Sequence, residues 1–207
     1  MNFTHKSLLI PLPLGVTLII ETTADQPTFN IQTGGIVTGE TATIDWGDGS
    51  TESFTRIYNA SHTYEKPGIY RIEISDVLSA ISIAVADTLA NYAAMVKALK
   101  INSSVFCFLS SKGLQNLTNI KTLDLSKTNV TQLTAYCCRN CTSLTEVFAS
   151  KVKKFDTAST TQLPFAGCTA LKKIHFAAEN EAAITATPAY QADPHLGAPS
   201  AEVLFDL

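Results

Sequence analysis

The chain has 207 residues, of which 45% are hydrophobic and 16% charged, and its formal net charge is −3. This length and hydrophobicity suffice for one large or two small buried cores, and they exclude a disordered chain and a collagen-like fibre. The charge balance leaves no surplus of Lys and Arg to neutralise phosphates, so we expect no nucleic-acid partner.

Residues 1–15 are expected to form an N-terminal arm that belongs to no folded module. The apolar run 8–20 is interrupted by Pro11 and Pro13 and is too short to span a bilayer, so we expect no transmembrane segment. Lys6 followed by an apolar run resembles the start of a signal peptide, but cleavage there would remove a predicted strand. We therefore expect no signal peptide, and an arm able to dock on another subunit.

Residues 16–78 carry a succession of short strand patterns separated by turn signals. The turns are marked by Gly and Pro residues at 34–35, 47–49 and 67–68, and helical periodicity is absent. This spacing is typical of a small antiparallel β-sandwich.

Residues 79–207 carry an internal repeat. Copies open at Ala93, Leu117, Cys141 and Cys168, and Gly197 opens a degenerate fifth. Each copy ends in an apolar–x–apolar triplet, which predicts a short strand with two interior positions per copy. Two interior columns are predicted. The first consists of Leu99, Leu123, Val147, Ile174 and Val203, and the second consists of Ile101, Leu125, Ala149, Phe176 and Phe205. Stacked copies of this period predict a solenoid of leucine-rich-repeat type.

The segment 179–200 breaks the repeat before it ends. Pro188, Pro194, Gly197 and Pro199 predict an irregular loop without a long helix. Residues 201–205 then restore the apolar alternation, so we expect them to form the terminal strand of the repeat.

Three motifs in the first half occur in the order found in PKD domains, which are immunoglobulin-like sandwiches. They are Asp45-Trp46-Gly47-Asp48-Gly49-Ser50, then His62-Thr63-Tyr64, then Pro67-Gly68-Ile69-Tyr70-Arg71-Ile72. The first half therefore resembles a PKD domain.

The second half resembles the BspA-like leucine-rich repeats of bacterial surface proteins, in which Phe-x-Gly-Cys-Thr-x-Leu-x-x-Ile recurs. Residues 165–174 match this pattern throughout, whereas residues 136–147 match loosely, with Arg139-Asn140 where Ala-Gly is expected. The Asn ladder of better-known repeats is absent, because Thr128 and Val152 occupy its places.

These resemblances imply modules used for display, adhesion and binding, on the bacterial cell surface or in virion proteins of phages infecting such bacteria. They imply an extracellular location and no reaction, so we expect a non-enzymatic binding or structural protein. The first alternative is a structural or decoration protein of a phage virion. The second is an accessory module of a glycan- or peptide-processing enzyme.

The Asp-Gly loop has two chemical alternatives to a structural role. Asp45 and Asp48 could ligate calcium, and His62 could act as a base beside them. The loop does not continue into an EF-hand, however, and no Ser or Cys nucleophile occupies a recognisable elbow. We expect a structural motif comprising Asp45, Trp46, Gly47, Asp48, Gly49, His62 and Tyr64, with the tryptophan in the sandwich core.

The cysteines Cys137, Cys138 and Cys141 could hold zinc together with Cys168 or His175, or form a disulfide. Their repeat positions favour a different interpretation, because Cys141 and Cys168 share a frame position with Leu117. We expect them to be small buried residues, and we predict no metal, cofactor or catalytic residue.

The strand positions that alternate with the interior columns should point outward. This row contains the predicted binding residues Lys100, Asp124, Phe148 and His175, and a face of mixed charge with an exposed aromatic suits a protein or glycan partner. A plain solvated sheet face is the alternative. Asp124 and Glu146 are the only carboxylate pair that could serve the enzyme hypothesis.

Overall fold

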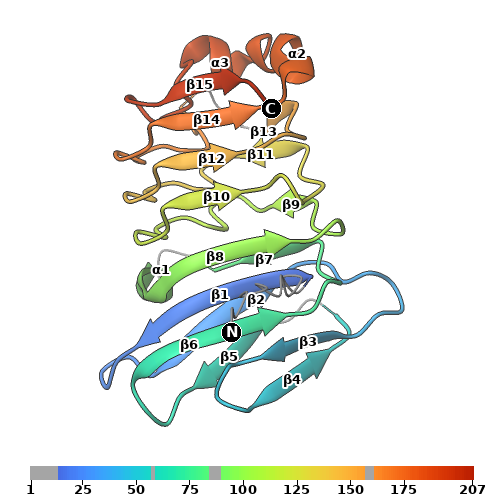
Figure 1. Cartoon of the computed structure of the whole chain (residues 1–207), viewed down its shortest axis with the longest axis vertical. Helices are drawn as coiled ribbons and strands as arrows, with labels where there is room; N and C mark the ends of the chain where they lie inside the picture. The colour runs from blue at the N-terminus through green and yellow to red at the C-terminus, as the bar shows by residue number, and fades with distance from the viewer. Residues whose placement is uncertain (1–13, 57–58, 84–89, 157–160) are drawn as a thin grey trace, which may run out of the picture.

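The structure, a computed structural model, describes residues 14–56, 59–83, 90–156 and 161–207. The fold is mainly β and contains several sheets, as predicted (Figure 1). Of the expected N-terminal arm, residues 1–13 lie outside the described residues, and Gly15 already begins the first strand.

The first half contributes most of a five-stranded antiparallel sheet with the order β4-β3-β6-β1-β8. Its strands are β1 (Gly15–Thr22), β3 (Ala42–Asp45), β4 (Thr51–Phe54), β6 (Gly68–Ile74) and β8 (Val96–Asn102). The apolar alternation puts Leu18, Ile20, Ile72 and Ile74 on the buried side of β1 and β6.

A second sheet has the order β5-β2-β7-β9 and consists of β2 (Thr28–Thr33), β5 (Asn59–Thr63), β7 (Ala80–Ser82) and β9 (Phe108–Leu109). Phe29 and Ile31 of β2 belong to the same hydrophobic cluster as the buried residues of the first sheet, and so does Trp46. This arrangement of two sheets is consistent with a β-sandwich.

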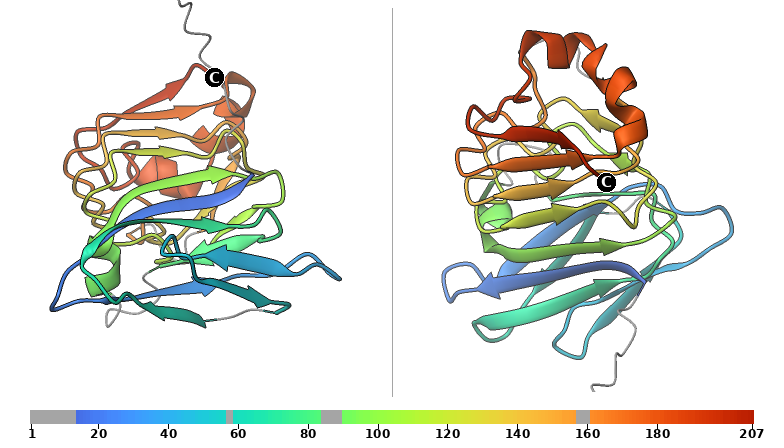
Figure 2. Two further views of the ribbon diagram at one scale, coloured as in Figure 1. Left: turned by 60° about the horizontal axis from the view of Figure 1, so that its bottom comes forward. Right: turned by 45° about the horizontal axis from the view of Figure 1, so that its top comes forward.

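In the described residues the second half forms two parallel ladders besides the parallel pair β7–β9. The first contains β10 (Thr122–Asp124), β12 (Glu146–Phe148), β14 (Lys173–Phe176) and β15 (Glu202–Phe205), and the second contains β11 (Gln132–Thr134) and β13 (Lys154–Asp156). The ladder pairs Leu123 with Val147, Val147 with Ile174, and Ile174 with Val203, which is the predicted register of the first interior column. Figure 2 shows these strands stacked beyond the antiparallel sheet.

The first predicted repeat strand does not join the parallel ladder. Helix α1 (Ala90–Met95) leads into β8, which pairs antiparallel with β1, so that Leu99 lies opposite Leu18 and Ile101 opposite Val16. The apolar–x–apolar triplet occurs in both kinds of strand, and β1 offers a long apolar edge. The predicted place of Leu99 and Ile101 beside Leu123 and Leu125 in the stack is therefore wrong as regards strand pairing, although Ile101 is buried in the same hydrophobic cluster.

Residues with positive φ recur at the turns that open the four copies after the first. They are Asn116 (φ 62°), Asn140 (59°), Gly167 (77°) and Gly197 (92°). Asn is the residue other than Gly that best tolerates this conformation, which explains why Asn140 replaces the expected Gly. The Asn140 amide also donates to Asn116 Oδ1 at 3.2 Å, so neighbouring copies are bonded through this turn.

The segment 179–200 contains only short helices. The 3-10 helix η2 (Ala178–Asn180) is followed by α2 (Glu181–Thr185) and α3 (Pro188–Ala192). Both α-helices lie at the end of the parallel ladder remote from the antiparallel sheet (Figure 1). Tyr190 of α3 contacts Phe205 with ring centroids 6.5 Å apart, so these helices cover part of the terminal strand.

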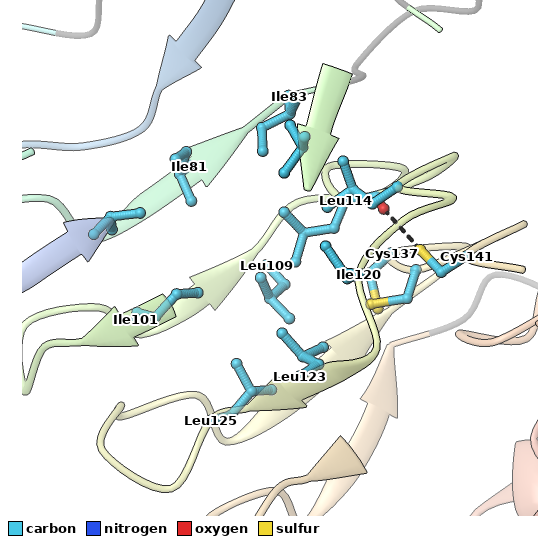
Figure 3. Packing of buried hydrophobic residues seen from close by; sticks show 14 of the residues in the cluster. Ile81, Ile83, Ile101, Leu109, Leu114, Ile120, Leu123, Leu125, Cys137 and Cys141 are labelled. Carbon is cyan, nitrogen blue, oxygen red and sulfur yellow. Dashed lines mark hydrogen bonds between the residues drawn. The ribbon is translucent and has the colours of Figure 1, made fainter. Parts of the chain in front are cut away.

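Buried residues form one continuous hydrophobic cluster through both halves. At the junction, Ile81 and Ile83, just beyond the predicted boundary at residue 78, lie near Leu109, Leu114 and the repeat residues beyond them (Figure 3). The division into 16–78 and 79–207 stays a prediction, because no gap in the core marks it.

Candidate functional site

The outward face of the parallel ladder carries three of the four predicted binding residues. Asp124, Phe148 and His175 are consecutive partners across β10, β12 and β14. Their side chains alternate with the buried Leu123, Val147 and Ile174, which fixes them on the opposite side of the sheet. Lys100 lies on β8, opposite Thr17 in the antiparallel sheet, and so stands apart from this ladder.

His175 is the centre of a polar cluster on this face. Its Nδ1 lies 2.8 Å from Asp206 Oδ1 and its Nε2 lies 3.2 Å from Glu146 Oε1. Its ring stacks on Phe148 with centroids 4.8 Å apart and planes 10° apart. Each ring nitrogen of His175 therefore faces a carboxylate, which fixes the orientation of the ring.

The cluster buries the histidine and leaves its partners accessible. The His175 side chain is 9% exposed, whereas the carboxylates of Glu146 and Asp206 are 38% and 50% exposed. Phe148 is half-buried. The face therefore offers an aromatic ring flanked by two acceptors, a set able to contact the apolar side and the hydroxyl or amide donors of a polar ligand.

Asp206 is a member of this cluster that the sequence analysis missed. It follows β15 and lies beyond the repeat frame. The strand alternation contained the signal, because residues 202, 204 and 206 share one side of an extended chain.

The carboxylate pair of the enzyme hypothesis is divided between two environments. Asp124 is exposed, and its Oδ1 accepts the Ser126 amide at 2.8 Å. Glu146 instead contacts His175. The two carboxylates therefore bind different partners, Asp124 the Ser126 amide and Glu146 the His175 ring.

A groove lies beside this face, between β8 and β10. Its volume is about 710 Å³, and it arises because β8 belongs to the antiparallel sheet and β10 to the parallel one. The residues that line it are Leu14, Leu99, Lys100, Ile101, Asn102, Thr122, Asp124 and Lys127. Sequence patterns could not predict this groove, because it exists only where β8 and β10 belong to different sheets.

The Asp-Gly loop is held by its own hydrogen bonds. Asp45 Oδ1 accepts the Gly47 amide at 2.9 Å, and Asp48 Oδ1 accepts the Ser50 amide at 3.0 Å and the Ser50 hydroxyl at 2.5 Å. Asp48 Oδ2 lies 2.7 Å from His62 Nε2. These contacts occupy the carboxylates within the loop, as a structural motif requires.

Aromatic stacking extends the loop into the core. Trp46 is buried and stacks on His62 with centroids 5.0 Å apart, and the buried Tyr64 donates its hydroxyl to the Trp46 carbonyl at 2.9 Å. Burial raises the pKa of Tyr64, so its hydroxyl stays a donor. A hydrolytic triad would need Asp48 and Ser50 on different ring nitrogens, but Nε2 faces both at 2.7 and 3.4 Å.

Partial burial would raise the pKa of Asp48, but hydrogen bonds from the Ser50 hydroxyl, from His62 and from the Ser50 amide lower it to about 2. The carboxylate is therefore ionised at neutral pH. Its charge and its bonds hold the loop against β5.

Four of the five cysteines, Cys137, Cys138, Cys141 and Cys168, are buried in the repeat, whereas Cys107 is exposed, and all five are free. Cys141 Sγ donates to the Leu114 carbonyl at 3.1 Å, and Cys168 Sγ donates to the Cys138 carbonyl at 3.0 Å. Each thiol therefore bonds the preceding copy at an equivalent place, as the dashed line in Figure 3 shows for Cys141.

Protonated thiols suit this role. A hydrogen bond with Cys137 and burial raise the pKa of Cys138, and a hydrogen bond with Cys168 and burial raise that of Cys141. The hydrogen bond with Cys141 instead lowers the pKa of Cys168. Zinc requires thiolates, and these surroundings disfavour them at Cys138 and Cys141. Within the described part of the chain, no group of three or more His, Cys, Asp or Glu residues is arranged to hold a metal ion.

Among the described helices, none is long and apolar enough to cross a membrane. Comparisons of the chain with protein-family models, with curated proteins and with solved structures found no match. The site therefore has to be interpreted from its own geometry.

Proposed function

We propose that the protein is a non-enzymatic binding or structural protein that recognises a protein or glycan through the outward face of its parallel ladder. The observation that carries the proposal is the cluster of Phe148, His175, Glu146 and Asp206, which combines an accessible aromatic ring with two acceptors on a rigid sheet. Sites on regular strands hold their side chains in fixed positions, as recognition requires.

The proposed architecture is a PKD-like, immunoglobulin-like sandwich followed by a short solenoid of BspA-like leucine-rich repeats. The hydrogen bonds of the Asp-Gly loop support the first part, because they give Asp45, Asp48, His62 and Tyr64 the scaffold roles expected of the motif. The parallel ladder, the recurrent positive-φ turn and the thiol bonds between copies support the second.

The proposed setting is an extracellular one, on a bacterial cell surface in adhesion. A structural or decoration role in a phage virion would use the same face, since a fold does not determine its biological setting. Both settings need a recognition surface and no reaction.

An array that combines purified proteins with bacterial, plant and animal polysaccharides tests the proposal. The protein, the Phe148→Ala variant and the Phe108→Ala control are compared on each ligand. Phe108 is 40% exposed on β9, which is not part of the ladder β10-β12-β14-β15. The control variant therefore removes an aromatic side chain of the same kind from a different surface. We expect a ligand that Phe148→Ala binds at least about tenfold more weakly and that the control retains. Turnover of any arrayed ligand that Glu146→Gln or Asp124→Asn abolishes would contradict the non-enzymatic role.

A further inference from the structure

The groove between β8 and β10 lies where two sheets meet without joining. In the described residues β8 has its ladder partner in β1 and β10 has its partner in β12, so the facing edges of β8 and β10 form no ladder with each other. Figure 1 shows the two strands as neighbours along this seam. Two strand edges that form no ladder with each other and lie beside a hollow are a favourable place for an extended segment to bind.

The lining of the groove combines an apolar base with a polar rim. Leu99 is half-buried and Ile101 is buried, while Lys100, Thr122 and Asp124 are exposed. Leu14 completes the lining and is 66% exposed, although it is a large apolar residue at the mouth of an apolar hollow. Gly15, the next residue, pairs with Asn102 at the end of β8.

The residues that precede Leu14 have a composition suited to this groove. Residues 1–13 lie outside the described residues, and six of them, Leu8-Leu9-Ile10-Pro11-Leu12-Pro13, are four large aliphatic residues and two prolines without a charged or polar side chain. Two prolines two residues apart disfavour a helix and favour extended backbone. Fully extended, the 13 residues 1–13 would reach about 40 Å, which exceeds the roughly 23 Å length of a seven-residue strand such as β8.

We propose that residues 1–13 bind in the β8–β10 groove of their own chain, with the apolar run against Leu99 and Leu14. The covalent link at Leu14 keeps the segment at the mouth of the groove, so a short tether supplies an effective concentration of the order of millimolar without requiring a high intrinsic affinity. Occupation also removes the apolar run from water. The proposal stands apart from the function proposed above, because Phe148, His175, Glu146 and Asp206 do not line the groove, although Asp124 of the same face does.

Thermolysin cleavage of the full chain tests the proposal, because this protease cuts before exposed Leu and Ile residues such as Leu9 and Ile10. The rate of cleavage in this run is followed by mass spectrometry. Thr122→Trp places an indole in the groove from an exposed position on β10, and Lys173→Trp is the matched control on β14, outside the groove.

We expect Thr122→Trp to accelerate cleavage at least about tenfold and Lys173→Trp to leave it unchanged, because only the first displaces the segment. Leu14→Asp, at a site that is already exposed, should also accelerate cleavage and does not threaten the fold. Equal rates in all four proteins would overturn the proposal. Protection that grows with protein concentration over about a hundredfold range would assign the groove to the segment of a second copy and overturn its assignment to the same chain.

Discussion

At the scale of single residues, Gly47 and Gly49 of the Asp-Gly loop allow two costs of a substitution to be compared: the strain of a positive φ and the steric clash of an added Cβ. Both Gly47 and Gly49 have positive φ, 81° and 95°. A Cβ on Gly47 would lie 2.4 Å from the Arg71 carbonyl oxygen, whereas a Cβ on Gly49 meets nothing within 4 Å. Gly49→Ala should therefore cost about 1–2 kcal/mol from strain alone, and Gly47→Ala clearly more. Urea unfolding of both variants measures the difference, and equal losses would show that β6 yields to the added methyl group.

The pKa of Asp48 predicts an acid-sensitive loop. Its folded value of about 2 lies below the unfolded value of 3.8, so the ionised carboxylate stabilises the fold above pH 3.8 and loses this contribution as the pH falls toward 2. The difference in Tm between the protein and Asp48→Asn should thus be constant near neutral pH and shrink across this acid range. Asp25→Asn, at an exposed turn, is the control. A difference independent of pH would mean that the loop depends on the shape of Asp48 and not on its charge.

The residues of the loop could be predicted from the sequence, whereas the histidine cluster could not. The motif 45–50 is local, so its turn chemistry is visible in adjacent residues. The contacts of His175 join residues 29 and 31 positions away, Glu146 and Asp206. The outward row predicted where His175 lies but not that neighbouring side chains bury it.

At the scale of elements, the terminal strand β15 covers the last copy of the repeat. Ile174 and Phe176 are fully buried, and β15 pairs with both. Deleting residues 201–207 should expose them and destabilise the fold by several kcal/mol, at about 1.5–3 kcal/mol for each large side chain. Deleting residues 206–207 alone removes Asp206 and keeps the strand, so it should cost less. Equal stability of the longer truncation and the full chain, measured by urea unfolding, would show that β15 does not cap the core.

The strands of the second half differ in how well their pairing could be predicted. The periodic triplets at 123, 147, 174 and 203 were enough to predict the register of β10, β12, β14 and β15. The same triplet in β8 predicted the wrong partner, because local alternation does not distinguish a parallel neighbour from an antiparallel one. Strand β8 pairs instead with the edge of β1, which lies about 80 residues earlier in the sequence and which local patterns in β8 do not reveal.

At the scale of the whole molecule, the continuous cluster predicts cooperative unfolding. Strand β8 completes the antiparallel sheet from beyond the predicted boundary at residue 78, and Lys97 of β8 pairs with Glu21 of β1 at 2.9 Å. We expect one calorimetric transition with equal calorimetric and van't Hoff enthalpies. Two transitions, one of them unchanged when residues 201–207 are deleted, would instead show that 16–78 and 79–207 are independent domains.

If the outward face of the parallel ladder is the recognition surface, the Phe148→Ala variant should bind the ligand identified by the array more weakly than the parent protein does. We expect a Kd at least about tenfold higher for this variant and an unchanged Kd for Phe108→Ala, with both variants as stable as the parent to within about 1 kcal/mol. An unchanged Kd for Phe148→Ala, together with a raised one for Phe108→Ala, would contradict the claim and move the recognition surface to the sheet that contains β9.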